Sequence, residues 1–433
     1  MRIAYTILTY LLLPVYASYW LFRGLGNRTY WDRLGQRFGI GYPKFVAGCI
    51  WVHAVSVGEV QASVPLIRAL MKQFPERQVL LTTVTPTGGE RVRLLFGESV
   101  AHSYIPFETP NSISSFFNAV RPEIALIMET EIWPNLYQEC GRRKIPLVLV
   151  SARISAKSVK SYRKFLPLFR DTLSYGIVIA AQSQLDADRF RSLGAAPERT
   201  WVTGNIKFDI ELPDDLIERG ADFRRDNFED RPVWIAASTH DREEEQVLHA
   251  HELVLKKFPN ALLILVPRHP ERFAAVRALL HKRGHKFISR TDDLRCTSDI
   301  EVLFGDTMGE VPLFYAAGNV AFVGGTLVPV GGHNLLEPAA LGLPVVTGPY
   351  LFSTQDIADK FEKLGASVTV NNAGQLGIAI ADLFTDEDSA IDIGNRGREI
   401  VMRNKGALER LLRLLQPLLK KVPQAKGRQD RAS

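Results

Sequence analysis

The chain has 433 residues, of which 46% are hydrophobic and 23% are charged. This composition is typical of a globular protein with a sizeable core, and it excludes a disordered, collagen-like or small disulfide-stapled protein. At roughly 100–200 residues per domain, the length predicts two or three domains. The three cysteines lie far apart and form no C-x-x-C pair, so neither a disulfide framework nor a structural zinc site is expected.

The net charge of +6 is concentrated at the two ends of the chain. Residues 1–44 contain six basic residues and one acidic residue, and residues 396–433 contain eleven basic and three acidic residues. These ends contribute +5 and +8, so the 351 residues between them carry −7. A basic stripe through the fold is not indicated, so no nucleic-acid partner is expected. Basic ends on a mildly acidic body predict instead that the chain meets an anionic membrane surface.

The N-terminal segment predicts a membrane anchor over residues 1–24. The run from Ile3 to Phe22 contains no charge, and as a helix it would be about 30 Å long. Aromatic residues of the kind found at membrane interfaces cluster towards its ends: Tyr5, Tyr10, Tyr16, Tyr19 and Trp20. The arginines that follow it predict a cytoplasmic location for the rest of the chain: Arg23, Arg28, Arg33 and Arg37. A buried core helix and a cleaved signal peptide are the alternatives, and Pro14 leaves both a spanning and an interfacial helix open.

From residue 49 onward, short apolar runs alternate with amphipathic stretches. Strand-like runs in the first half are Ile50–Ala54, Val79–Val84, Ile124–Met128, Leu147–Val150 and Ile177–Ala181. Those in the second half are Val233–Ala237, Leu262–Val266, Val302–Phe304, Val320–Val323 and Val345–Thr347. Helix-like stretches include Gln61–Gln73, Ser112–Val120, Ser183–Leu193, Glu243–Phe258, Glu271–Arg283, Pro312–Ala317 and Leu335–Leu341. This alternation predicts an α/β fold whose parallel sheets are covered on both faces.

A polar, charged segment over residues 206–232 divides the chain and predicts a linker with one short exposed helix at most. We therefore expect two Rossmann-like domains that face a cleft, residues 25–205 and residues 233–433. The second includes a long, basic, amphipathic helix over Arg403–Leu419. Ligands are expected beyond the carboxyl ends of the strands.

The segment Gly324–Pro349 is the most informative for ligand binding. Its glycines precede a helix expected to start near Asn334, so the backbone can approach an anion held by the first-turn N–H groups. Glu337 lies in that first turn, where its carboxylate can accept both hydroxyls of a ribose. A plain helix cap at Asn334 is the alternative, but the E-P-x-x-x-G-x-P-V pattern in the second Rossmann-like domain favours a nucleotide site.

Two further strand-end loops are expected to face the same site. Arg268 and His269 follow an apolar strand and can reach a phosphate or a base edge. The loop over residues 305–310 places the backbone N–H groups of Gly309 and Glu310 before a helix, where they can bind an anion. Helix capping and ordinary loop structure are the alternatives for both.

The first half of the chain predicts a different chemistry. Glu59 lies at a strand-to-helix turn, where its carboxylate can act as a general base, although a helix-terminal acid is the alternative. Glu129, the segment 151–155 and Lys207 follow later strands. Carboxylates and cations at successive strand ends are typical of an active site, although capped helices and surface ion pairs produce the same residues singly.

Short motifs stand in order along almost the whole chain: HAVSVGE at 53–59, METEIWPN at 128–135, SARIS at 151–155, GNIKFD at 204–209, ASTHDREEE at 237–245, PRHPERF at 267–273, GDTMGE at 305–310 and GGHNLLEPA at 331–339. Together with the N-terminal anchor, they resemble the 3-deoxy-D-manno-octulosonic acid (Kdo) transferases of lipopolysaccharide biosynthesis. One departure is Asp241-Arg242, where Glu-Gly is expected in many relatives.

The resemblance implies a GT-B glycosyltransferase in the bacterial inner membrane, with its catalytic body on the cytoplasmic face. The enzyme would transfer Kdo from CMP-Kdo to the lipid A precursor lipid IVA, with inversion and without a metal or other cofactor. Glu59 would be the general base, and Glu129 and Lys207 would stabilise the transition state. The CMP-binding positions would be Arg268, His269, Met308, Gly309, Glu310, Asn334, Leu335, Leu336 and Glu337.

Two other functions remain open from the residues alone. One is a GT-B transferase that uses a UDP-sugar on another membrane acceptor, because the E-P-x-x-x-G-x-P-V pattern is widely shared. The other is a membrane-tethered scaffold that has lost its catalytic role. Nucleotide binding and nucleotide preference discriminate among the three functions.

Overall fold

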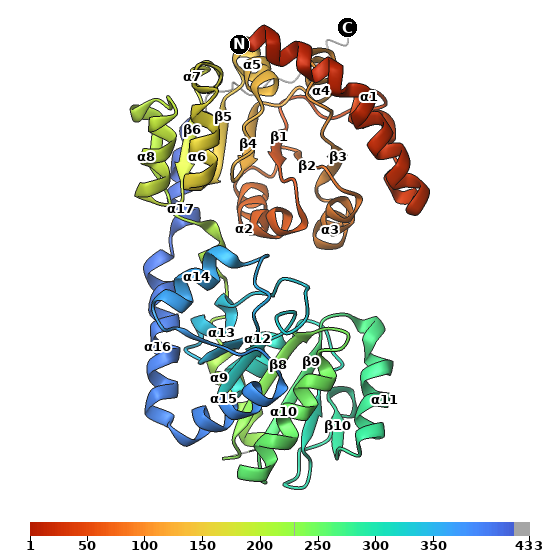
Figure 1. Ribbon diagram of the computed structural model, residues 1–433, viewed down its shortest axis with the longest axis vertical. Helices are drawn as coiled ribbons and strands as arrows, with labels where there is room; N and C mark the ends of the chain where they lie inside the picture. Colours follow the sequence, from red (N-terminus) through yellow and green to blue (C-terminus); the bar gives the residue numbers. More distant parts are fainter. Residues whose placement is uncertain (229, 420–433) are drawn as a thin grey trace, which may run out of the picture. The chain divides into compact units, whose positions relative to one another are not determined.

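The computed structural model describes residues 1–228 and 230–419. The chain forms two compact units (Figure 1). Unit 1 contains residues 1–209 and the segment that begins at Lys405, and unit 2 contains Ile210–Asn404. Each unit is built around one parallel sheet with helices on both faces, as the alternating sequence pattern predicts.

The sheet of unit 1 has the strand order β3-β2-β1-β4-β5-β6-β7 and is parallel throughout. Its strands are β1 Ile50–His53, β2 Val79–Thr83, β3 Ala101–Tyr104, β4 Ile124–Met128, β5 Leu147–Ala152, β6 Val178–Ala181 and β7 Thr200–Val202. The chain adds strands on one side of β1 and then returns to the other side at β4. The loops after β1 and β4 therefore lie at the point where the strand order reverses, which is where ligands bind in open α/β sheets.

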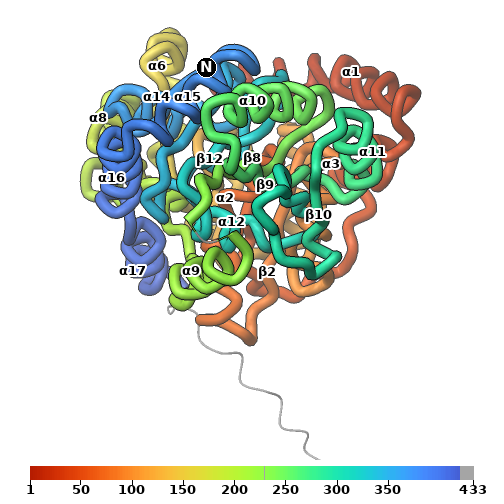
Figure 2. Tube along the Cα trace, turned by 90° about the horizontal axis from the view of Figure 1, so that it is seen from below, coloured from red at the N-terminus to blue at the C-terminus, as the bar shows by residue number. Residues whose placement is uncertain are grey.

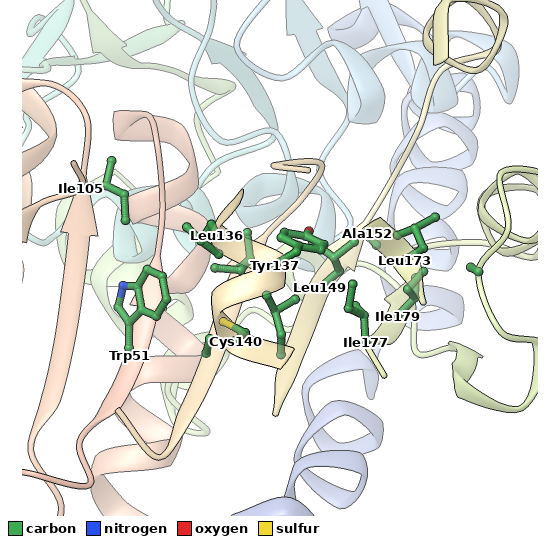
Figure 3. Packing of buried hydrophobic residues seen from close by; sticks show 14 of the residues in the cluster. Trp51, Ile105, Leu136, Tyr137, Cys140, Leu149, Ala152, Leu173, Ile177 and Ile179 are labelled. Carbon is green, nitrogen blue, oxygen red and sulfur yellow. The ribbon is translucent and has the colours of Figure 1, made fainter. Parts of the chain in front are cut away.

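Alternating side chains of the strands in unit 1 fill two separate cores. Trp51 and Leu149 face the helices α4 and α5 on one side, where Tyr137 and Cys140 are buried (Figure 3). Val52, the neighbour of Trp51, packs on the opposite side with α2, α3 and α17. The helices of this unit are α1 Arg2–Gly26, α2 Val57–Gln73, α3 Pro86–Phe96, α4 Pro110–Val120, α5 Pro134–Arg143, α6 Ala156–Arg163, α7 Leu166–Leu173, α8 Gln184–Ser192 and α17 Ala407–Leu419.

The sheet of unit 2 has the order β10-β11-β9-β8-β12-β13-β14, again parallel. Its strands are β8 Val233–Thr239, β9 Leu262–Pro267, β10 Phe287–Ser289, β11 Val302–Phe304, β12 Val320–Val323, β13 Val345–Thr347 and β14 Ser367–Thr369. Its helices are α9 Leu216–Asn227, α10 Glu244–Lys257, α11 Phe273–Arg283, α12 Val311–Ala317, α13 Leu336–Ala340, α14 Gln355–Lys363, α15 Ala373–Thr385 and α16 Glu387–Asn404. Figure 2 shows α10 and α15 on one side of the sheet and α9 and α12 on the other.

The segment 206–232, which the sequence predicts as a linker, is mostly part of unit 2. Its helix α9 packs against α12, and Gly220 lies so close to Ala316 that a Cβ at residue 220 would meet the Ala316 carbonyl group. The many charges of α9 lie on its outer face. The composition of the segment therefore does not reveal its apolar contact with α12.

The prediction of one C-terminal helix over Arg403–Leu419 is wrong in two respects. The helix is broken at Lys405-Gly406, where Gly406 has φ +84°, and its halves belong to different units. The second half, α17, is part of unit 1 rather than of the predicted domain 233–433. Two contacts hold it there, because the Asp209 carboxylate accepts hydrogen bonds of 2.6 Å from the N–H groups of Gly406 and Leu408.

The N-terminal helix α1 lies along the outside of unit 1 beside α4 and α5 (Figure 1). Among the described residues it is the one helix long and apolar enough to cross a membrane. Two parts of the sequence interpretation need correction. Tyr5, Tyr16 and Trp20 face the protein rather than a membrane interface, and Arg37 is fully buried with its guanidinium 3.5 Å from the centre of the Trp20 ring.

We predict that Leu415→Ala lowers the free energy of unfolding of unit 1 by about 2–5 kcal/mol, because Leu415 is fully buried beneath the sheet and its loss leaves a cavity. Chemical denaturation measures the change. Gln416→Ala in the same helix is the matched control, since Gln416 is exposed. Equal stability of the two variants would contradict the assignment of α17 to the core of unit 1.

Candidate functional site

Two carboxylates of unit 1 lie where the strand order reverses. Glu59 follows β1 in the first turn of α2, and Glu129 follows β4 directly. The sequence predicts both as site residues, and the structure brings them close enough for the charge of Glu129 to raise the pKa of Glu59.

Glu59 is held by the start of its own helix. Ser56 is the N-cap, and its Oγ accepts a hydrogen bond of 3.2 Å from the Glu59 N–H group and donates one of 3.1 Å to Glu59 Oε1. The Val55 N–H group donates a hydrogen bond of 2.9 Å to Glu59 Oε2. Burial raises the pKa of Glu59 to about 7, and the nearby carboxylates Glu129 and Glu131 act in the same direction.

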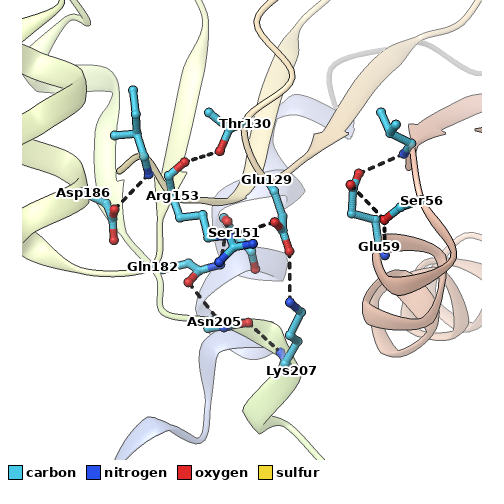
Figure 4. Close-up of polar contacts among 12 residues, drawn as sticks. Ser56, Glu59, Glu129, Thr130, Ser151, Arg153, Gln182, Asp186, Asn205 and Lys207 are labelled. Carbon is cyan, nitrogen blue, oxygen red and sulfur yellow. Dashed lines mark hydrogen bonds and ion pairs between the residues drawn. The ribbon is translucent and has the colours of Figure 1, made fainter. Parts of the chain in front are cut away.

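Glu129 is held in the opposite electrostatic environment (Figure 4). Its Oε1 lies 3.0 Å from Lys207 Nζ, and its Oε2 lies 2.8 Å from Arg153 Nε. Burial raises the pKa of Glu129, but the attraction of Lys207 and Arg153 outweighs burial and lowers it below its ordinary value. Its backbone has φ +54°, a strained conformation that persists where surrounding contacts determine it.

A polar network positions Lys207. The Lys207 N–H group donates to Asn205 Oδ1 at 3.0 Å, and Asn205 Nδ2 contacts Gln182 Oε1 at 3.3 Å (Figure 4). Ser151 completes the network, because its Oγ accepts from the Ile206 N–H group at 3.2 Å. Ser151 itself has φ +48° at an irregularity of β5, so the ends of two neighbouring strands are both strained here.

These environments separate the roles of the two carboxyl groups. A carboxyl group with a pKa near 7 can exchange a proton at neutral pH, whereas an ion-paired carboxylate stays charged. The alternative interpretation of Glu59, a helix-terminal acid, is also correct locally, because Glu59 lies in the first turn of α2 and is hydrogen-bonded to the N-cap residue Ser56. A role in capping the helix alone would not require the pKa of Glu59 to be raised.

In unit 2, one buried carboxylate joins the two loops at the reversal of strand order. Glu243 follows β8 and is fully buried. Its Oε1 accepts from the N–H groups of Thr326 and Leu327 at 3.0 and 2.9 Å, and its Oε2 accepts from Gly325 at 2.7 Å and His240 at 3.1 Å. The loop after β12 is therefore fixed to the loop after β8.

The predicted nucleotide segment begins a short helix, as the sequence indicates. Asn334 Oδ1 accepts from the Leu336 N–H group, and Asn334 Nδ2 donates to Glu337 Oε1, both at 3.0 Å. Burial raises the pKa of Glu337, and the hydrogen bond from Asn334 and the charge of Arg268 act against it. Leu335 and Leu336 are buried, so their backbone groups rather than their side chains can contact a ligand.

Basic and imidazole groups gather beside this helix. His240 and His333 stack with their Nε2 atoms 2.7 Å apart, and the ring of His269 lies 5.5 Å from that of His240. Burial lowers the pKa of His240 to about 4, and the charges of His269 and Arg268 act in the same direction. Positive groups at a glycine-rich loop are suited to an anionic ligand.

The loop over residues 305–310 is tied to its own unit by ion pairs. Arg290 Nη2 lies 3.1 Å from Glu310 Oε1, and Arg277 Nη2 lies 2.7 Å from Asp306 Oδ2. Gly309 has φ +85°, and the side chain of Met308 is 59% exposed. A ligand can therefore meet Met308 and the backbone of this loop, whereas the Glu310 carboxylate is already paired.

Comparisons with known proteins identify the family of the chain. Residues 32–210 match the family model of 3-deoxy-D-manno-octulosonic-acid transferase (kdotransferase), and residues 230–400 match that of group 1 glycosyl transferases. The 3-deoxy-D-manno-octulosonic acid transferase of Haemophilus influenzae is 41% identical over 426 residues, which cover 97% of this chain and 99% of that protein. The chain belongs to the Kdo transferase family.

Two solved structures illustrate the similarity. The C-terminal CMP-Kdo binding domain of WaaA from Acinetobacter baumannii is 32% identical and covers 43% of this chain and 97% of its own, with a TM-score of 0.42. UDP-GlcNAc 2-epimerase from Neisseria meningitidis is 16% identical over 85% of this chain and 99% of its own, with a TM-score of 0.51. The second comparison shows a shared fold. This Kdo transferase family member is thus a glycosyltransferase with the GT-B type of fold.

Sequence reasoning missed the roles of two residues in this Kdo transferase. Arg153 lies in the quoted motif SARIS but was assigned no contact, and it is a direct partner of Glu129. Glu243 lies in ASTHDREEE among three consecutive glutamates, of which Glu243 and Glu244 are both buried, and the pattern does not reveal that Glu243 binds the loop after β12.

The expected departure from the family at Asp241-Arg242 has a structural correlate. Arg242 has φ +63°, a conformation that a glycine adopts without strain. Asp241 Oδ1 lies 2.9 Å from Arg272 Nη1 and so helps to hold the turn.

We predict that Glu129→Gln lowers the pKa of Glu59. The substitution removes a negative charge that raises this pKa and leaves the positive charges of Lys207 and Arg153 uncompensated nearby. Carboxyl-carbon NMR titration of glutamate-labelled protein measures the shift. Glu139→Gln is the control, because Glu139 is paired with Arg142 and Arg143 elsewhere. An unchanged or raised pKa of Glu59 would contradict the electrostatic coupling.

We predict that Glu243→Gln accelerates hydrogen exchange within the segment Gly325–Leu327 by at least about tenfold. A carboxamide keeps one acceptor oxygen, so two of the four bound N–H groups lose their partner at a cost of about 1–3 kcal/mol each. Exchange followed by mass spectrometry detects the change, with Glu245→Gln at an exposed neighbouring position as the control. Unaltered exchange would show that another group holds the loop.

Proposed function

We propose that this Kdo transferase family member moves Kdo from CMP-Kdo to the lipid A precursor lipid IVA with inversion. The observation that carries the proposal is the pair of oppositely shifted carboxyl groups, Glu59 and Glu129. Glu59 accepts the proton of an acceptor hydroxyl as the new bond forms between the hydroxyl oxygen and the anomeric carbon of Kdo. The bond between that carbon and the phosphate oxygen breaks, and CMP leaves with the electron pair. A single base is sufficient for such a direct displacement.

Glu129 and Lys207 act on charge rather than on the proton. Kdo carries a carboxylate beside its reacting carbon, and the ammonium group of Lys207 is suited to pair with it. The ion pair with Glu129 holds the ammonium group of Lys207 at a fixed position before substrate arrives. Arg153 prevents Glu129 from drawing a proton, because it holds the second carboxylate oxygen.

Unit 2 supplies the groups for the nucleotide. Arg268 and His269 provide positive or donor groups for the phosphate, Glu337 accepts from the ribose hydroxyls, and the backbone around Gly309 and Asn334–Leu336 completes the site. CMP is a monophosphate leaving group, so basic side chains and backbone N–H groups are sufficient to stabilise it without a metal. Among the described residues, no cluster of three or more histidines, cysteines or acidic residues is placed to hold a metal; metal independence stays a prediction.

The proposed lipid acceptor accounts for the presence of the apolar helix α1 on this protein. Lipid IVA is a phosphorylated lipid, so the enzyme must work at a membrane surface. We propose that the protein is held at the bacterial inner membrane with its body on the cytoplasmic face. Arg23, Arg28, Arg33 and Lys44 are exposed and are suited to an anionic lipid surface.

Incubation of the detergent-solubilised full chain with lipid IVA and freshly generated CMP-Kdo tests the reaction. Mass spectrometry of the lipid should show the addition of Kdo, and its absence with folded protein would overturn the proposal. Thermal-shift titration with CMP and with UDP gives an independent measurement. Stronger stabilisation by UDP would favour a UDP-sugar transferase, and no stabilisation by either would favour a scaffold.

We predict that Glu59→Gln abolishes transfer but leaves the affinity for CMP unchanged, because Glu59 lies in unit 1 and acts on the acceptor. In the unaltered enzyme, kcat/KM should rise with pH up to about 7 and then level, since only the ionised base accepts a proton. Steady-state kinetics and CMP thermal shifts measure both effects. Glu98→Gln, at an exposed position, is the control. Retained turnover in Glu59→Gln would remove Glu59 from this role.

A further inference from the structure

The helix α1 has an inverted distribution of polar and apolar side chains. Its large apolar residues point away from the protein: Ile3, Ile7, Leu8, Leu11, Leu12, Val15, Leu21, Phe22 and Leu25 are all exposed. Its polar and aromatic contacts point inward, at Arg2, Tyr5, Thr6, Thr9, Tyr16 and Trp20. A helix on the surface of a water-soluble protein has the opposite arrangement.

The inward face is attached to unit 1 along its whole length. At its start, Arg2 Nη1 lies 2.6 Å from Asp171 Oδ2 and Arg2 Nη2 donates to the Pro134 carbonyl at 2.7 Å. In its first turns, the Tyr5 hydroxyl donates to the buried Glu108 carboxylate. Near its end, Trp20 is 3% exposed.

Removal of α1 would expose groups of unit 1 that depend on its side chains for burial or for a partner. Burial raises the pKa of Glu108 to about 7, and the hydrogen bond from Tyr5 partly opposes this rise. Trp20 covers the fully buried guanidinium of Arg37. Tyr16 stacks on Phe107, with ring centroids 4.2 Å apart. A helix that crossed a bilayer would have to give up these contacts.

We propose that α1 lies flat in one membrane leaflet as an interfacial helix, with its inner face docked on unit 1 and its apolar outer face in contact with anionic lipid. Arg23 and Arg28, at the carboxyl end of the helix, are exposed and can contact lipid phosphates. Their contact with the phosphates limits how deeply the helix enters the leaflet. This inference deepens the proposed function, since Asn135, a partner of α1, lies in the first turn of α5, directly after the loop that begins at Glu129. The loop that carries Glu129 is thereby connected directly to a helix on which α1 docks.

Disulfide cross-linking tests the docked arrangement in the membrane-bound full chain. Thr6 Oγ1 donates to Asn135 Oδ1 at 3.2 Å, so Thr6→Cys combined with Asn135→Cys should cross-link both in detergent and on vesicles of phosphatidylethanolamine and phosphatidylglycerol. Ile7→Cys with Asn135→Cys is the matched control, because Ile7 points outward and should not cross-link. A Thr6–Asn135 link that forms in detergent but not on vesicles would overturn the proposal, as would its failure in both.

Vesicle flotation tests the lipid contact. Leu11→Gln, Val15→Gln and Phe22→Gln together should reduce the bound fraction at least about tenfold without lowering the unfolding temperature, because all three side chains are exposed. The control combines Ile217→Gln, Ile378→Gln and Ile391→Gln, which are equally exposed apolar residues of unit 2, and should bind as the unaltered chain does. Unchanged binding of the α1 variant would overturn the proposal, as would self-association through α1 in place of lipid binding.

Protease protection of an N-terminal epitope tag separates the interfacial helix from a spanning one. In inverted membrane vesicles, the tag should be digested together with the body of the protein, and protection of the tag would overturn the proposal. Neither lipid IVA nor CMP-Kdo enters these experiments. Their outcome is therefore independent of the transfer assay, and a failed transfer reaction leaves the membrane result unaffected.

Discussion

The ion pair between Glu129 and Lys207 determines much of the chemistry available to unit 1. Glu129 has to keep its charge in a partly buried position at the end of β4, and Lys207 and Arg153 make the charged form the stable one. The retained charge then acts on Glu59, whose own surroundings already disfavour ionisation. One carboxyl group is thus fixed as an anion and the other is left able to take up a proton near neutral pH. The separation arises from the neighbours of each carboxyl group and not from any difference between the two side chains.

Unit 2 uses a buried carboxylate in a different way. Glu243 has no basic partner among its hydrogen-bond contacts and is instead surrounded by backbone N–H groups from two loops. It therefore acts on geometry, because it holds the glycine-rich loop after β12 against the turn after β8. Both sheets place their buried carboxylates at the reversal of strand order, where adjacent loops diverge and need a group that joins them. In this family member, the same topological position holds a carboxyl group with a raised pKa in one unit and a carboxylate that joins two loops in the other.

The central strands of both sheets could be predicted from the sequence, but the edge strands could not. Every strand predicted from its apolar run is present, and the runs IALIM and LLILV are central, buried strands as expected. The four strands that sequence reasoning missed are the outermost ones, β3, β7, β10 and β14. An edge strand pairs on one side only and is partly exposed, so its residues need not be apolar, and AHSY and TWV carry no continuous hydrophobic signal. The break at Gly406 was missed for a related reason, because amphipathic periodicity continues across it while the partner of the helix changes from one unit to the other.

The candidate site residues could be located from the sequence, but the conformation that presents them could not. Among the described residues, the non-glycine positions with positive φ fall into two groups: Arg33, Arg121, Lys144 and Asp293 at helix caps, and Glu129, Ser151, Ser238 and Arg242 at the carboxyl ends of β4, β5 and β8. Each residue of the second group raises the free energy of the folded protein by about 1–3 kcal/mol. None of these residues is a glycine, the residue type that usually indicates a positive φ. At Glu129 the cost is offset by the two cations that hold its carboxylate, so the strain persists only while the ion pairs are formed. The backbone conformation and the charge of Glu129 are therefore parts of one arrangement, which a pattern of residue types along the chain does not contain.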